Sequence, residues 1–363
     1  MNNAQRKKLI PKIILVLLCL IAAALFAQHL HRQGKPAALV FCGAIWIVLA
    51  YYLCIIIHET GHLVTGLLSG YEFLSFRIGS AAWVKTDNGI ERKKLELAGS
   101  GGQCIMMPPE TDTPENNPFL LYFAGGGLFN LLTALICLPL AACIKNSYAA
   151  QPFLITGLIS LYLAIFNLVP MNLQLPNDGY NMMMFRRSRE QRITLYQNLR
   201  VNGLLYRGLT LSEMPETLFT IGDGTGFGDM IHASLLIEQH DFPAAEALLE
   251  AAAQSGRLPG YYENECMCEI LFCKIMNRAS EDEIRSVYGK TLQDFIAGAE
   301  KTQISKRRLM YAYYLIFKRN PEAAQKEYHA AQAMKHTYPS AGELKSEYAL
   351  IEYIRQCGTA ETA

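Results

Sequence analysis

The sequence has few charged residues and almost no net charge. Only 18% of its 363 residues are charged, 51% are hydrophobic, and the formal net charge is +1. This balance leaves no broad basic field of the kind that attracts nucleic acid, and the sequence has no basic stripe interleaved with aromatic residues. We therefore expect no nucleic-acid partner.

Paired cysteine motifs are also lacking. The ten cysteines are scattered singly, and several lie within apolar runs, where a thiol behaves as a small hydrophobic group. The closest pair is Cys266 and Cys268, a C-x-C without a second pair or a histidine, which is a weak pattern for zinc or a disulfide. Reduced thiols facing the cytosol are the simpler interpretation.

Long apolar runs, in contrast, are abundant in the first half of the chain. A helix needs about 20 apolar residues to cross a bilayer, and the segments 9–27, 37–57, 119–144 and 152–169 satisfy this requirement. We predict four membrane spans. The first could instead be a cleaved signal peptide, because basic residues precede a short apolar stretch that ends in three alanines.

Basic residues near the ends of these runs predict their orientation, because lysine and arginine tend to stay in the cytoplasm. The basic residues of 6–12, 77–94 and 186–192 fall on one side of the predicted membrane, and only three fall on the other. We expect a multi-pass protein of the cell membrane, embedded in the lipid bilayer. Both termini and the loop 69–117 should be cytoplasmic.

The predicted fold class is mainly α: a polytopic helical membrane domain with a small β-hairpin insertion, followed by a soluble α-helical repeat-like domain. The expected parts are 1–36 (first span and external loop), 37–180 (membrane core) and 181–363 (cytoplasmic helical domain). Two stretches of the last part resemble tetratricopeptide-like helix pairs, with small and large residues at the same offsets. These residues are Ala233, Leu236, Phe242, Ala245, Leu249 and Ala252, then Ala312, Leu315, Ala324, Tyr328 and Ala331. Stacked helices of this kind could bind a cytoplasmic partner, or could form a cap without one.

A metal-binding pattern follows the second apolar run. His58, Glu59 and His62 form H-E-x-x-H, and four residues on an α-helix turn only about 40° beyond a full circle, so both imidazoles project from one face. Zinc favours such a pair together with a third ligand, and Glu59 could take a proton from water. Two helix histidines that align by chance are the alternative, but ionisable residues beside a membrane span usually have a function.

Asp178 is the best candidate for the third ligand. It follows the fourth apolar run, at the same predicted membrane face as the two histidines, and the neighbouring proline and glycine break the helix so that a carboxylate could turn inward. An Asn-Asp-Gly turn that only leads into the soluble domain is the alternative. Glu72 and Glu96 are the fallback candidates.

Together these motifs resemble the site-2 protease family of intramembrane metalloproteases. The marks of that family are H-E-x-x-H in one span and N-x-x-P followed by D-G in a later one, which correspond here to Asn167–Pro170 and to Asp178 with Gly179. Within the third run, Gly126–Asn130 resembles the family's G-P-x-x-N, with Gly127 standing where proline is usual. The interval before Asp178 is longer than the usual family pattern. By resemblance, Asn167 and Asn130 help to position the substrate or the catalytic centre. Asn130 could equally form only hydrogen bonds that hold neighbouring helices together.

Residues 71–98 predict a β-hairpin around the turn at 87–89. The site-2 protease family carries a membrane-associated β-element beside its active site, and an exposed edge strand could hold an extended peptide by backbone pairing. A hairpin that only packs on the protein is the alternative. The glycines at 99, 101 and 102 are interpreted as a flexible joint.

The function expected from these observations is a zinc-dependent intramembrane endopeptidase that cuts membrane-embedded or membrane-tethered proteins or peptides. The alternative is a membrane scaffold or peptide-export component that keeps zinc as a structural ion. A structural zinc site would normally have four protein ligands, whereas the sequence offers His58, His62 and Asp178.

Overall fold

The structure is a computed structural model and describes residues 37–86, 89–95, 101–171, 176–219, 226–258 and 260–359. The predicted first span, 9–27, lies outside these residues. The described chain forms two compact units. One contains the residues up to Ile57 together with Phe129–Ile165, and the other contains His58–Leu128 and the residues from Phe166 onward.

Three described helices are long and apolar enough to cross a membrane. They are α2 (Ala37–Leu68), α3 (Phe119–Cys143), which follows the short helix η1 (Pro114–Asn116), and α4 (Ser147–Leu168). The helix α2 runs on past His58, as expected for a helical H-E-x-x-H, and ends at Leu68, just before Gly70. That glycine has a φ of 78°, and the next backbone N–H, of Tyr71, donates to the Gly66 carbonyl, which closes the helix end.

In the first unit, polar contacts join α2 to α4. The Trp46 indole Nε1 donates to the Pro152 carbonyl at 2.9 Å and to Thr156 Oγ1 at 3.1 Å. Further along, the Cys54 thiol lies 3.1 Å from Ser160 Oγ. These contacts satisfy polar groups inside apolar helices, where an unpaired group would be costly.

The second unit contains a four-stranded antiparallel sheet instead of the single predicted hairpin. Its strands are β1 (Glu72–Ile78), β2 (Ala81–Thr86), β3 (Gly89–Lys94) and β4 (Gly102–Met107), in the order β3-β2-β1-β4. The predicted hairpin is present as β2 and β3, which pair from Thr86 with Gly89 back to Ala81 with Lys94. Its predicted extent was wrong, because Gly79, with a φ of 59°, begins a two-residue turn that splits the first arm into β1 and β2. The segment interpreted as a flexible glycine joint continues into β4, which pairs with β1.

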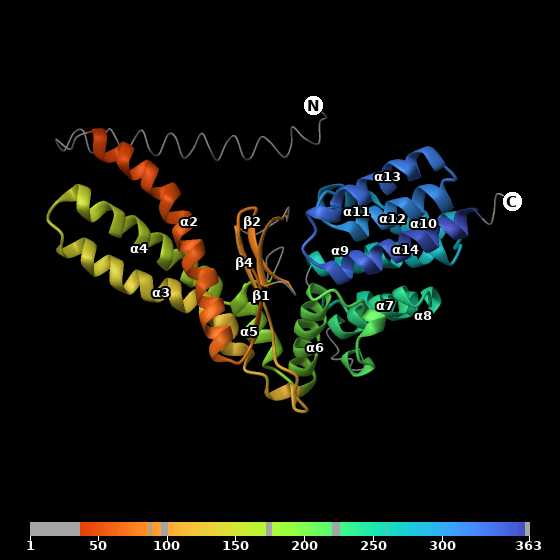
Figure 1. Cartoon of the computed structure of the whole chain (residues 1–363), viewed down its shortest axis with the longest axis horizontal. Helices are drawn as coiled ribbons and strands as arrows, with labels where there is room; N and C mark the ends of the chain where they lie inside the picture. Colours follow the sequence, from red (N-terminus) through yellow and green to blue (C-terminus); the bar gives the residue numbers. More distant parts are fainter. Residues whose placement is uncertain are drawn as a thin grey trace. The chain divides into compact units, whose positions relative to one another are not determined.

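The rest of the second unit is helical. Its elements are α5 (Asp178–Phe185), α6 (Arg189–Tyr206), η2 (Leu211–Glu213), η3 (Glu216–Leu218), α7 (Phe227–Glu238), α8 (Phe242–Gln254), α9 (Gly260–Met276), α10 (Glu281–Val287), α11 (Lys290–Ala299), α12 (Ile304–Ala312), the π-helical turn η4 (Tyr313–Phe317), α13 (Pro321–Ala333), η5 (Met334–His336) and α14 (Ala341–Thr359). In Figure 1, α9, α12 and α14 lie beside one another, and contacts between them join these helices into one core.

Helix pairs form at both tetratricopeptide-like stretches. In the pair α7 and α8 and in the pair α12 and α13, the alanines named from the sequence are buried, and the larger residues are buried or partly buried. Asp241 and Asn320 cap the second helix of each pair in the same way, each accepting a backbone hydrogen bond three residues later. Their membership of a true repeat family stays a prediction.

The helix α6 joins the C-terminal helices to the sheet. Gly203 lies against Met107 of β4, since a Cβ at this glycine would fall 2.4 Å from the Met107 sulfur. Leu74, Tyr196 and Leu204 complete a shared apolar core. This packing holds β4 between the helical domain and the residues described next.

Candidate metal centre

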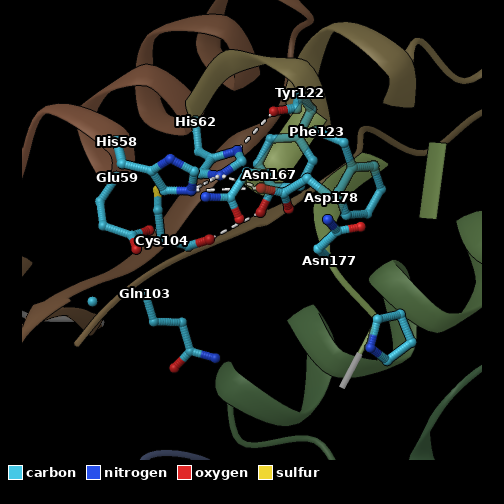
Figure 2. A pocket seen from close by; sticks show the side chains of 12 residues that line it. His58, Glu59, His62, Gln103, Cys104, Tyr122, Phe123, Asn167, Asn177 and Asp178 are labelled. Atoms are coloured by element: carbon cyan, nitrogen blue, oxygen red, sulfur yellow. Dashed lines mark hydrogen bonds and ion pairs between the residues drawn. The ribbon is translucent and has the colours of Figure 1, made fainter. Parts of the chain in front are cut away.

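The two histidines of H-E-x-x-H converge on one point. His58 and His62 lie one turn apart on α2, and their Nε2 atoms are 3.1 Å apart. Asp178 completes the group: its Oδ2 lies 3.5 Å from Nε2 of His58 and 3.4 Å from Nε2 of His62. Among the described residues these three side chains form a cluster that could hold a metal ion (Figure 2).

The orientation of His62 is set by the backbone of α3. Its Nδ1 lies 2.8 Å from the carbonyl oxygen of Tyr122, which can accept this bond because a helix carbonyl has a second lone pair. A proton on Nδ1 leaves the lone pair of Nε2 free to face Asp178 and a metal. The buried helix contact therefore selects the tautomer that a metal ligand needs.

Asn177 positions Asp178 at the start of α5. Its Oδ1 accepts from the backbone N–H groups of Tyr180 and Met171, and its Nδ2 donates to the carbonyls of Phe166 and Val169. One amide side chain thus joins the end of α4 to the first turn of α5. The prediction that Asp178 turns inward is supported, although the residue begins a helix instead of lying in a turn.

The environment of Asp178 favours its ionised form. Burial alone would raise the pKa of this carboxyl, but the positive charges and donated hydrogen bonds that His62 and His58 supply in their protonated form outweigh burial and hold the pKa below its ordinary value. An ionised carboxylate is the form that binds a metal cation.

Three glycines allow α2 and α3 to meet at the site. A Cβ at Gly61 would fall 2.3 Å from the carbonyl oxygen of Gly125, so the two backbones touch directly. A Cβ at Gly126 would fall 2.5 Å from both His58 Cε1 and His62 Nε2. Small residues permit such close helix approach, and the missing side chain at Gly126 leaves space beside the imidazoles.

His58, His62 and Asp178 line a pocket of about 240 Å³, and Glu59 lines it as well. Glu59 follows His58 on α2 and is only 8% exposed. The strand β4 contributes Gly102, Gln103 and Cys104 to the lining of this pocket, and Figure 2 shows the last two near the cluster. The arrangement places a carboxylate that is not one of the clustered ligands next to the centre, in a small pocket.

Two further groups adjust the charge of this pocket. Burial raises the pKa of the Cys104 thiol to about 12, which favours its neutral form, and the thiol is not part of the cluster of possible metal ligands. Arg77 is buried in β1; burial lowers the pKa of its guanidinium, and the nearby charge of Glu59 opposes this effect. A fixed positive charge therefore lies within electrostatic range of Glu59.

Asn167 lines the pocket, and the role expected for it from the resemblance stays a prediction, whereas Asn130 is fully buried on α3 and is not among the lining residues. The fallback candidates do not supply the third ligand here: Glu72 is paired with Lys85 and Arg207, and Glu96 lies outside the described residues.

Sequence reasoning missed Tyr122 and Cys104. Only the short apolar run of 104–107 after the glycines could have indicated a strand at the site.

No protein-family model matches this chain, and no curated protein or solved structure is similar to it. Its function is therefore inferred from the chemistry of the centre itself.

Proposed function

We propose that the protein is a zinc-dependent intramembrane endopeptidase. The observation that carries this proposal is the convergence of His58, His62 and Asp178 on one point, with the carboxylate of Glu59 beside them. Three protein ligands and a neighbouring acid are the pattern of a catalytic zinc site, in which the fourth position is left to water or substrate.

The ligand geometry supports zinc as the metal. With bonds of 2.0–2.2 Å to nitrogen and oxygen, tetrahedral coordination separates neighbouring ligand atoms by about 3.3–3.5 Å. The three separations in this centre are 3.1, 3.4 and 3.5 Å. Two neutral imidazoles and one carboxylate also form a donor set that zinc prefers.

A zinc ion in this centre would polarise the scissile carbonyl and make a water molecule acidic enough to attack it. Glu59 takes the proton from that water as its oxygen bonds to the carbonyl carbon, and then delivers it to the amine nitrogen as the C–N bond breaks. His62, held by the Tyr122 carbonyl, and Asp178, held by Asn177, keep the centre in place during this transfer.

The strand β4 offers a place for the substrate. It is an edge strand of the sheet, and its residues Gly102, Gln103 and Cys104 line the pocket. An extended segment that pairs with such an edge would be held by backbone hydrogen bonds beside Glu59, with little dependence on its side chains. The Tyr122 hydroxyl, which donates to the Cys104 carbonyl at 2.9 Å, occupies one edge position and would limit where pairing begins.

A membrane setting agrees with the outer surface of the apolar helices. In each of the three candidate spans only 22% of the most apolar window is buried, so most of these side chains need lipid or another apolar cover. We propose a multi-pass protein of the cell membrane in which the centre, the sheet and the C-terminal helices face the cytoplasm, as the basic residues predict.

The test of this function is Glu59→Gln, which keeps the shape of the side chain and removes the base. General-base assistance is worth about 10²–10⁴ in rate, so cleavage should fall by at least that order while zinc content and folding stay unchanged. Membrane peptides would be compared by quantitative mass spectrometry in cells that express wild-type or variant protein, and zinc would be measured in the purified protein. Glu110→Gln is the matched control, because its carboxylate is 87% exposed.

Uncut substrate should accumulate with Glu59→Gln and not with Glu110→Gln. Normal processing by Glu59→Gln would exclude the proposed mechanism and would favour the scaffold that keeps zinc as a structural ion. Purified wild-type protein that binds no zinc would exclude both the zinc-dependent protease and the scaffold with a structural zinc ion.

A further inference from the structure

The C-terminal helices line a second cavity, of about 290 Å³, that shares no lining residue with the metal pocket. Its walls come from α6, α7, α9, α12 and α14. Apolar side chains such as Leu205, Met230 and Leu350 form part of the wall. A volume near 300 Å³ lies at the lower end of ligand pockets, and it suits one long side chain better than a large molecule.

The buried cations at this cavity are already neutralised. Lys306, which is fully buried, pairs with Glu265 at 2.6 Å. Arg308 pairs with two carboxylates, Glu269 at 2.6 Å and Glu347 at 2.7 Å. Because one guanidinium serves two carboxylates, this cluster alone carries an excess of negative charge.

Two more carboxylates line the cavity without a cationic partner in the described part of the chain. Glu343 accepts a hydrogen bond from the Tyr338 hydroxyl at 2.5 Å, and Glu238 accepts from Ser346 Oγ and from two backbone N–H groups. Burial raises the pKa of Glu343 to about 7, which reflects the cost of its charge in this environment. Glu343 and Glu238 are both partly buried, and a carboxylate that is partly withdrawn from water without a cation is destabilised, so a bound cation would stabilise it.

A second observation concerns Arg308 itself. Its side chain is 2% exposed and lines the cavity, yet among the described residues its Nη1 has no hydrogen-bond acceptor. A buried donor left unpaired costs free energy. The cavity therefore lacks both a cation for its carboxylates and an acceptor for this donor.

We propose that this cavity binds a lysine or arginine side chain of a basic segment in a partner protein, with a backbone carbonyl of that segment accepting from Arg308. The cationic head would reach Glu343 and Glu347, and the apolar wall would cover the methylene stem. The partner is thus a protein with an exposed basic segment, and its binding does not depend on the metal centre.

The test measures fluorescence anisotropy of a labelled heptapeptide with a central lysine flanked by leucine and glycine, added to the full-length protein in nanodiscs. The comparison peptide carries norleucine in place of lysine. Since a hydrogen-bonded charge contributes about 1.5–3 kcal/mol, the lysine peptide should bind at least about tenfold more tightly. Glu343→Gln should remove most of this preference, whereas the exposed Glu322→Gln on α13 should keep it. Equal binding of the two peptides, or equal loss in both variants, would overturn the proposal.

A second variant guards against misfolding of Glu343→Gln. Ser234 is exposed on α7 and lines the cavity, so Ser234→Arg would supply the missing cation from within the chain. This variant should melt at a higher temperature than wild type and lose the lysine peptide, and Ser234→Ala should do neither. Peptide binding that persists in a folded Ser234→Arg protein would refute the assignment.

Discussion

A methyl group at Gly126 should disrupt the metal centre without touching a ligand residue. The Cβ of Gly126→Ala would lie 2.5 Å from His58 Cε1 and His62 Nε2, whereas ordinary contact begins at 3.4 Å. Both imidazoles would have to move by about 0.9 Å, and displacements near 1 Å can cost about 100-fold in a positioned site. We therefore expect zinc affinity to fall by about 10–100-fold, the range seen when groups that orient metal ligands are lost.

Gly127→Ala is the matched control, because it makes the same change one residue later on α3. Its Cβ would meet the flexible end of the Leu168 side chain at 2.5 Å and no ligand. Zinc affinity would be measured by competition with a chromogenic chelator, and folding by thermal unfolding after zinc removal. Alanine forms helices better than glycine by about 1 kcal/mol, so a loss of zinc should not reflect a weaker helix. The reasoning fails if Gly126→Ala binds zinc like wild type, or if Gly127→Ala loses as much.

Three further outcomes can be measured. Asp178→Ala should lose zinc, whereas Glu72→Gln should keep it; metal analysis of the two purified proteins would show the reverse pattern if the third ligand were misassigned. A reporter fused after residue 200 should be cytoplasmic and one inserted at 146–150 external, and the opposite accessibility would place the centre on the wrong membrane face. Because burial raises the pKa of Glu343 from 4.5 to about 7, the folded state holds this proton more tightly than the unfolded state, so stability should fall as pH rises through that window. As pH rises from 4.5 to about 7, the melting temperature should fall less in Glu343→Gln than in wild type. Equal dependence of melting temperature on pH in the two proteins would contradict this account.

The sequence allowed the histidines and Asp178 to be predicted because their signals are local or tied to the ends of apolar runs. The spacing of His58 and His62 determines their common face on any helix. The hydrogen bond from His62 to the Tyr122 carbonyl could not be predicted, because any helical residue offers a carbonyl and only the approach of α3 selects this one. The approach itself depends on glycines whose role is visible only once α2 and α3 are placed together.

The sheet was underestimated for a related reason. Pairing of β4 with β1 joins residues separated by two other strands, and such non-local pairing leaves little trace in a sequence read locally. In the C-terminal domain, Lys306 and Arg308 have the charges of surface residues, and their complete burial follows from partners on α9 and α14 that no local pattern identifies.

The side chain of Asn177 holds Asp178 in place, so that the position of Asp178 does not depend on how many residues connect α4 to α5. Since this amide is bonded to Met171 and the end of α4 on one side and to the start of α5 on the other, it fixes both ends of the segment that connects the two helices. Closing a flexible loop becomes only about 0.6 kcal/mol more costly with each doubling of its length. Evolution could therefore lengthen or shorten this segment, as in the long interval after Pro170, at a small cost in stability and with no displacement of the carboxylate.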